Sequence, residues 1–364
     1  MRINLALFLL LILGLASCED DTKDKSPSGA DFNRQALFAN LGEQVILPAF
    51  LDFANQTDSL KKAALSFRTQ PDLQSLEYLK AQWVLTKYSS KRIEQLKFGP
   101  LNETRMYSLV DKWPTNEDFI EGFIKGSDPI TESFIQTKGA TSKGLPAIEY
   151  LLFENHQPAS LLQQLIDEPR RVDYILACCT NLNQKALEIA SLWSPLGDNY
   201  LKTYEESTLS GLDGSLSLTV NQMSAHLEFM LLTKLGKPLG KDLNREADPS
   251  FLEAYRSEIS RHCLQENLII FHQLFTGADG IGFDDYLNQL NARKSNQLLS
   301  EVILNQLDKV ENQLQNIHPS LEGSLETAAT EELYQALRSL VVLVKADMSS
   351  ALSVTLTFTD NDGD

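Results

Sequence analysis

The chain has 364 residues, which is long for one compact core and suits two domains. Hydrophobic residues make up 43% of it and charged residues 22%, a composition typical of a packed globular protein and unlike a disordered chain or a protein with several membrane spans. The 49 acidic residues outnumber the 32 Lys and Arg residues, and the resulting net charge of −17 repels phosphate backbones and argues against nucleic-acid binding.

The N-terminal segment predicts a secreted, lipid-anchored protein. Arg2 precedes an apolar run, residues 5–13, that is too short to cross a bilayer but has the length of a signal-peptide core. The run ends in Leu15-Ala16-Ser17-Cys18, which resembles a bacterial lipobox, whose cysteine becomes lipidated. We therefore predict a lipoprotein signal peptide over residues 1–17 and a lipid anchor on Cys18. The expected location is the cell envelope, either periplasmic or anchored at the outer membrane or the cell surface.

The rest of the chain predicts an all-α protein after a flexible tether over residues 18–30. Apolar residues recur at three- and four-residue spacing, as at Leu37, Leu41 and Val45, and clusters of Gly and Pro separate the periodic segments. We expect two packed helical-bundle domains, an N-terminal one over residues 31–160 and a C-terminal one over residues 161–364. The predicted helices cover residues 31–55 with a disturbance at Pro48, 59–68, 72–97, 116–124, 129–137, 145–153, 169–193, 215–235, 250–275, 295–316 and 328–351.

Three cysteines remain after Cys18, and they do not predict a disulfide framework. Cys178 and Cys179 are adjacent in an apolar helical stretch, and Cys263 would be left without a partner. We expect Cys178 and Cys179 to pack in the core and to carry out no redox chemistry.

One segment, Lys143-Gly144-Leu145-Pro146-Ala147-Ile148-Glu149-Tyr150-Leu151-Leu152-Phe153, resembles the signature of the imelysin family, the M75 peptidase-like proteins, whose pattern is Gly-x-His-x-x-Glu. Further landmarks of that family follow in the expected order: Trp83, Phe98-Gly99-Pro100, Trp113-Pro114 with Asn116, Arg171 with Tyr174, Trp193, Lys237-Pro238-Leu239-Gly240 and the closing residues 356–364. The resemblance implies two helical bundles with the signature at their interface, an envelope location and a link to iron uptake. It also implies a zinc-peptidase activity that has been attributed to the family.

The signature departs from the family pattern at its metal-binding position. A His and a Glu three residues apart share one helical face and can reach one metal ion, but here the His position is Pro146, which offers no ligand atom. Pro is favoured in the first turn of a helix, so the helix start is expected to survive the change. The resemblance nevertheless places a functional cleft at Gly144, Pro146, Glu149, Trp113, Asn116, Glu117 and Arg171.

Other side chains are weak candidates for metal ligands. His156 lies seven residues after Glu149, about 10 Å further along if the helix continued. Glu258, His262 and Glu266 are spaced by four residues and would share one face of the helix predicted over 250–275, where Arg256 and Arg261 could instead pair with them. The metals to consider are iron and zinc, and no cofactor is assigned.

We expect a non-catalytic binding component of the cell envelope linked to iron uptake, with a membrane contact through Cys18 and an iron-uptake protein as its partner. No His-Glu-x-x-His, Gly-x-Ser-x-Gly or P-loop pattern occurs in the chain. The alternatives are a metal-dependent peptidase of the M75 type, with the missing His replaced from elsewhere, and a structural envelope lipoprotein.

The lipobox generates a direct test. Cys18→Ala removes the only thiol in a lipobox setting, so the variant should leave the membrane fraction or keep its leader uncleaved. Cell fractionation with mass spectrometry of the N-terminus measures both outcomes. A variant that is processed and fractionates like the wild type would contradict the lipid anchor.

Overall fold

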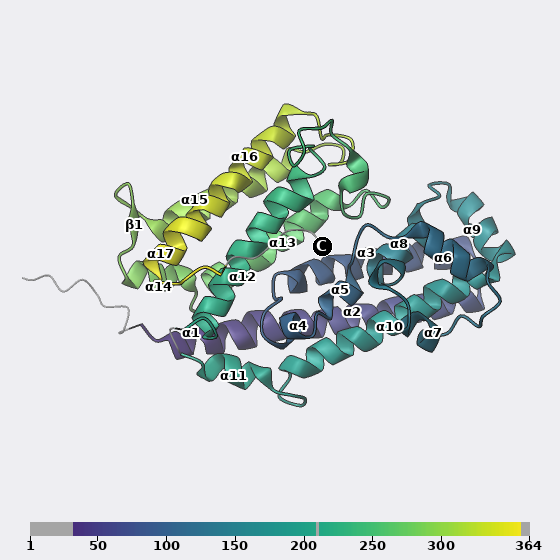
Figure 1. Cartoon of the computed structure of the whole chain (residues 1–364), viewed down its shortest axis with the longest axis horizontal. Helices are drawn as coiled ribbons and strands as arrows, with labels where there is room; N and C mark the ends of the chain where they lie inside the picture. The colour runs from purple at the N-terminus through teal and green to yellow at the C-terminus, as the bar shows by residue number, and fades with distance from the viewer. Residues whose placement is uncertain (1–31, 209–210, 358–364) are drawn as a thin grey trace, which may run out of the picture.

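The computed structural model describes residues 32–208 and 211–357, and these residues form two helical lobes (Figure 1). The predicted signal peptide, Cys18 and the tether lie outside the described residues. The first lobe contains α1 (Arg34–Asn40), η2 (Leu41–Ile46), α2 (Leu47–Thr69), α3 (Leu73–Glu94), α4 (Pro100–Glu103), α5 (Tyr107–Val110), α6 (Glu117–Lys125), α7 (Glu132–Gln136), η3 (Ala140–Ser142), α8 (Gly144–Phe153), α9 (Pro158–Asp167), α10 (Pro169–Trp193) and α11 (Tyr200–Glu206).

The second lobe is also helical and includes one short hairpin. It contains α12 (Ser215–Phe229), η4 (Met230–Gly236), η5 (Pro249–Phe251), α13 (Ser260–Thr276), α14 (Phe283–Gln289), β1 (Arg293–Lys294), β2 (Gln297–Leu298), α15 (Leu299–Gln315), α16 (Ala328–Val342), η6 (Leu343–Met348) and α17 (Ser349–Ala351). The two strands pair antiparallel, with Arg293 opposite Leu298. The all-α prediction is confirmed.

The two helices predicted over 31–55 and 59–68 form one continuous helix. The π-helical segment η2 ends at Ile46, two residues before Pro48, and α2 then runs from Leu47 to Thr69 without a break. Proline cannot donate to the preceding turn and its ring crowds that turn, and a wider π turn accommodates both effects without ending the helix. This helix, Arg34–Thr69, is long and apolar enough to cross a membrane by length and composition alone, but half of its most apolar window is buried inside the protein, as in ordinary core helices.

Helix α10 matches its predicted range and packs along α2, with α7 and α8 beside it. The chain therefore stays in the first lobe until after α11, as Figure 1 shows. The boundary between residues 160 and 161 stays a prediction, and this packing favours a later position for it.

The helix predicted over 250–275 is wrong in its first ten residues. Only the turn η5 forms there, Ala254 and Glu258 have positive φ angles, and α13 begins at Ser260. Positive φ angles interrupt a right-handed helix. The helix predicted over 295–316 likewise begins later, at Leu299, because residues 293–298 form the hairpin. Cys178 and Cys179 are buried, as expected; Cys263 is buried too, and all three are free thiols.

The lobes meet along α3 and α13 and at the start of the described chain. Phe32 stacks on Tyr286 of α14 with 4.1 Å between ring centroids, and Asn40 Nδ2 donates to the carbonyl oxygens of Gly277 and Ile281 at 2.9 and 3.0 Å. Helix α13 packs against α3. The first described residues of the chain thus already connect both lobes.

Helix α8 begins at a glycine whose conformation other residues avoid. Gly144 has φ +71°, and a Cβ atom there would lie 2.4 Å from the carbonyl oxygen of Val110 and 2.8 Å from that of Leu109. Both atoms belong to the backbone and cannot rotate away. The glycine therefore fixes how closely α8 approaches α5.

Gly144→Ala should consequently lower the free energy of unfolding by at least about 2 kcal/mol, from the left-handed backbone and the clash together. Urea denaturation measures it. Gly139→Ala is the matched control, because Gly139 is exposed, has φ −60° and has no atom within 4 Å of the added Cβ. This variant should unfold like the wild type. Equal stability of the two variants would contradict the role given to Gly144.

Candidate functional site

Helix α8 carries the signature segment, and its key residues are buried. Gly144 is its first residue, and Pro146 lies in its first turn, where a missing N–H leaves no intrahelical bond unmade. The expected helix start is thus confirmed. Glu149 lies one turn further on and is 3% exposed.

Glu149 binds the second lobe. Its Oε1 accepts hydrogen bonds from the backbone N–H of Ser257 at 3.0 Å and from Ser257 Oγ at 2.9 Å. Burial raises the pKa of Glu149, although Lys87, the Ser257 hydrogen bonds and Arg256 all act to lower it. This carboxylate therefore links α8 to the irregular segment 249–259. The sequence periodicity had predicted a helix for most of that segment.

Two arginines hold the acidic residues around α8. Arg256 pairs with Glu117 and Glu154, and its guanidinium lies 4.5 Å from the ring centroid of Tyr255. Burial alone would lower the pKa of Arg256, but its acidic partners raise it overall.

Arg171 of α10 pairs with Glu121 at 2.6 Å and with Glu168 at 2.9 Å. Asn116 is the N-cap of α6, because its Oδ1 accepts from the backbone N–H of Phe119 at 3.1 Å. The predicted cleft residues Asn116, Glu117 and Arg171 thus have partners within the protein. Trp113, half-buried, precedes a cis peptide bond to Pro114.

Next to Glu149, a group of six buried charges joins the lobes. It combines three residues of α3, one residue that follows α5, one from η4 and one from the segment 249–259. We call this group the interface cluster; its members are Lys87, Lys91, Glu94, Asp111, Lys234 and Glu253. The side chains of all six are at most 2% exposed.

Within the interface cluster, Asp111 and Glu94 each contact two ammonium groups. The carboxylate of Asp111 lies 2.7 Å from Lys87 Nζ and 2.5 Å from Lys91 Nζ. Glu94 lies 3.2 Å from Lys91 Nζ and 2.5 Å from Lys234 Nζ.

Glu253 contacts all three lysines, with its oxygens 2.6 Å from Lys234 Nζ, 2.8 Å from Lys91 Nζ and 3.7 Å from Lys87 Nζ. Three ammonium and three carboxylate groups therefore balance in formal charge.

These contacts decide the protonation states. Burial acts to raise the pKa of Asp111, but Lys87 and Lys91 outweigh it and the net pKa is lowered. The same balance, with Lys234 and Lys91, holds the pKa of Glu94 well below its usual range. The pKa of Lys91 is raised well above its ordinary value, because three carboxylates outweigh its burial. Asp111, Glu94 and Lys91 are thus held in their charged forms near neutral pH.

Polar and aromatic groups line the interface cluster. Asn267 of α13 accepts from Lys234 Nζ at 2.7 Å and donates to the backbone oxygen of Lys91 at 2.8 Å. Lys97 Nζ lies between the rings of Tyr107 and Phe229, 5.2 and 5.3 Å from their centroids, and burial lowers its pKa.

His226 of α12 is 1% exposed, and burial holds its pKa well below the ordinary value. Among the described residues, neither of its ring nitrogens has a hydrogen-bond partner.

The other predicted metal ligands do not converge. His156 is exposed beyond the end of α8, and Glu258 lies in a turn with φ +56°, before α13 begins. The shared helical face predicted for Glu258, His262 and Glu266 is therefore wrong. His262 lies against the ring of Tyr88, 5.9 Å between centroids, and Glu266 pairs with Arg92 at 2.7 Å.

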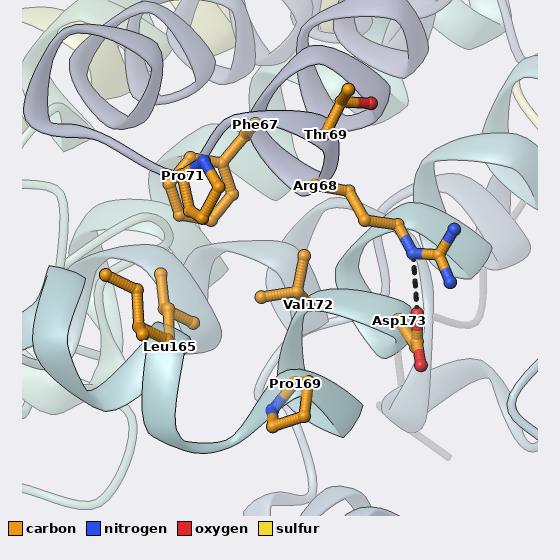
Figure 2. Close-up of a pocket in the computed structure, with 9 residues that line it drawn as sticks. Phe67, Arg68, Thr69, Pro71, Leu165, Pro169, Val172 and Asp173 are labelled. Atoms are coloured by element: carbon orange, nitrogen blue, oxygen red, sulfur yellow. Dashed lines mark hydrogen bonds and ion pairs between the residues drawn. The ribbon is translucent and has the colours of Figure 1, made fainter.

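A cavity of about 370 Å³ lies elsewhere, at the end of the first lobe between α2, α9 and α10 (Figure 2). Apolar side chains such as Phe67, Leu165 and Val172 form most of its wall, and Arg68 Nε donates to Asp173 at 2.8 Å on one side. None of the predicted cleft residues lines this cavity.

The family is decided by a comparison over most of the chain, since the sequence model of the imelysin family, Peptidase_M75, matches residues 46–345. This protein belongs to the imelysin family. No protein with a curated description matches it.

Solved structures show the same fold. An imelysin-like protein from Psychrobacter arcticum 273-4 is 18% identical, with a TM-score of 0.72 over 89% of this chain and 97% of that one. A "putative iron-regulated protein A precursor" from Parabacteroides distasonis ATCC 8503 is 14% identical, with a TM-score of 0.71 over 87% of this chain and 94% of that one. At these identities the likeness establishes the imelysin fold and nothing about ligands.

Sequence reasoning missed the interface cluster of this imelysin-family protein. The available signal was the spacing of Lys87, Lys91 and Glu94, which places all three on one face of α3. Such a pattern usually marks a solvated helix face. The same face carries Leu76, Leu79 and Trp83 in the first half of α3, and this continuity with an apolar stripe was the sequence sign that the three charges are buried.

The buried Glu149 carboxylate predicts a pH dependence. Its pKa is higher in the folded than in the unfolded protein, so its contribution to stability is fully present below the unfolded-state value and is lost as the pH rises through the folded-state value. Glu149→Gln keeps an oxygen that accepts both Ser257 hydrogen bonds but carries no charge. The variant should be at least as stable as the wild type at about pH 8 and should lose less stability between about pH 5 and 8.

Urea denaturation at several pH values measures this difference. Glu149→Ala is the comparison, because it removes the acceptor as well and should be destabilised at every pH. A Glu149→Gln protein clearly less stable than the wild type at about pH 8 would show that the negative charge itself is needed.

Proposed function

We propose that this imelysin-family protein is a lipid-anchored, non-catalytic component of the cell envelope that takes part in iron acquisition. The signature residues themselves support the proposal that the protein is not an enzyme. Pro146 replaces the ligand, and Glu149 is buried and bound to Ser257, so neither residue is available to a metal ion or a substrate.

A metal-dependent peptidase of the M75 type is less well supported. General acid–base chemistry needs a group that can exchange a proton with substrate or water. Every member of the interface cluster is buried and paired, and Asn116 and Glu117 are engaged in helix capping and in the Arg256 ion pair. Iron or zinc is therefore not placed at the signature in this proposal.

The link to iron rests on family membership and on the iron-regulated name of one structural neighbour. The envelope location rests on the lipobox-like sequence at Cys18. The binding role needs a surface that is open to a partner or ligand. Among the cavities of the described residues, the one between α2, α9 and α10 has the size of a small-ligand site and lies away from the filled signature region.

A structural envelope role is the second candidate, and the filled lobe interface favours it. The buried residues of α8 and the fully paired interface cluster leave the signature region without groups that converge on an open space. The two candidates differ in whether loss of the protein matters only when iron is scarce.

The test is growth of a gene-deletion strain with and without an iron chelator in the medium. Under the iron proposal, the deletion slows growth and lowers cell iron only under limitation; wild-type protein restores both and Cys18→Ala does not. A defect independent of iron supports the structural role. Purified wild-type protein should also show no peptide hydrolysis that a chelator abolishes, and such an activity would overturn the non-catalytic assignment.

A further inference from the structure

The interface cluster has the carboxylate geometry of a cation site. One oxygen each from Glu94, Asp111 and Glu253 can be chosen so that all lie within 4.8 Å of one another, and all three residues are buried. Oxygen-rich sites of this kind suit hard divalent ions such as Mn²⁺ or Mg²⁺.

The lysines already place positive charge against the carboxylate oxygens, as a metal ion would. Lys91 Nζ lies within 3.2 Å of oxygens from all three carboxylates, and Lys234 Nζ lies within 2.7 Å of Glu94, Glu253 and Asn267. An ammonium group has three donors, so both groups have as many acceptors as they can use. The positions between the carboxylates are thus filled by nitrogen atoms.

The charge count points the same way. Three lysines and three carboxylates sum to zero, so a divalent ion added to them would leave an excess charge of about +2 in a buried site, which is strongly unfavourable. If two lysines were replaced by uncharged residues, the remaining charge of about −2 would match a divalent ion.

We propose that the lysines of the interface cluster stand in permanently for a metal ion, so that this protein joins its lobes with internal cations and takes no divalent ion there. The proposal extends the metal-independent part of the proposed function. It assigns Lys91 and Lys234 as the residues that exclude the metal. It also implies that the carboxylates form a latent cation site, which appears when those lysines lose their charge.

The test compares Mn²⁺ binding by wild-type protein and by Lys91→Met/Lys234→Met. Methionine preserves much of the side-chain length and apolar volume. The double variant, purified with Mn²⁺ present, should bind about one ion by electron paramagnetic resonance, with a dissociation constant at least about a hundredfold lower than that of the wild type. Its melting temperature should rise by at least about 2 °C on addition of Mn²⁺, while that of the wild type stays unchanged.

A charge-balanced control separates the charge effect from the loss of packing. Lys234→Met/Glu94→Gln removes one charge of each sign, so it should fold without Mn²⁺ and bind none. It should also be more stable than Lys234→Met alone, which leaves a carboxylate uncompensated. This control keeps the proposal testable if the double lysine variant does not fold.

Two results would overturn the proposal: Mn²⁺ bound at the interface cluster of the wild type with a micromolar dissociation constant, or a folded double lysine variant that binds no Mn²⁺. The peptide-hydrolysis test on wild-type protein distinguishes this failure from failure of the proposed function. Hydrolysis that a chelator abolishes, in wild-type protein with no Mn²⁺ at the interface cluster, would count against the proposed function and leave the lysine assignment untouched.

Discussion

The pairing of three buried lysines with three buried carboxylates is the constraint on which the rest of this structure depends. Ionised groups are tolerated in a protein interior only when all of them are paired, and removal of one partner typically costs about 3–5 kcal/mol. Helix α3 supplies three of the six charges, and η4 and the segment 249–259 supply two others from the second lobe. These elements can therefore keep only one relative position, which also seats α13 against α3.

The signature helix, α8, packs against the elements that carry two residues of the interface cluster, Asp111 and Glu253. Gly144 lets α8 approach α5, which ends next to Asp111, and Glu149 reaches Ser257 in the segment that carries Glu253. The ion pairs of Glu253 and the hydrogen bonds between Glu149 and Ser257 thus join the segment 249–259 to the first lobe. In this family member the signature therefore serves the joining of the lobes, and its Glu acts as a hydrogen-bond acceptor.

The first turn of α8 accommodates Pro146 at the position where the signature that this segment resembles has a His. Proline satisfies the first turn of α8, because that turn needs no N–H donor. The lysines of the interface cluster place positive charge next to its three carboxylates, and our proposal that no divalent ion binds there rests on these contacts. The formal charges of the interface cluster are thus balanced by side chains of the protein itself.

The sequence by itself determined the helical class, the range of α10, the first turn of α8 and the family resemblance, because these depend on local periodicity and on residues near one another in the chain. It also predicted a lipid anchor at Cys18, which lies outside the described residues. Only the tertiary structure decided that Lys87, Lys91 and Glu94 are buried, since a helical pattern shows which residues share a face and not what covers that face. Their partners Lys234 and Glu253 come from elements far along the chain, and one of them lies where periodicity predicted a helix that does not form. The burial of a charge is settled by such distant partners, and no local pattern contains them.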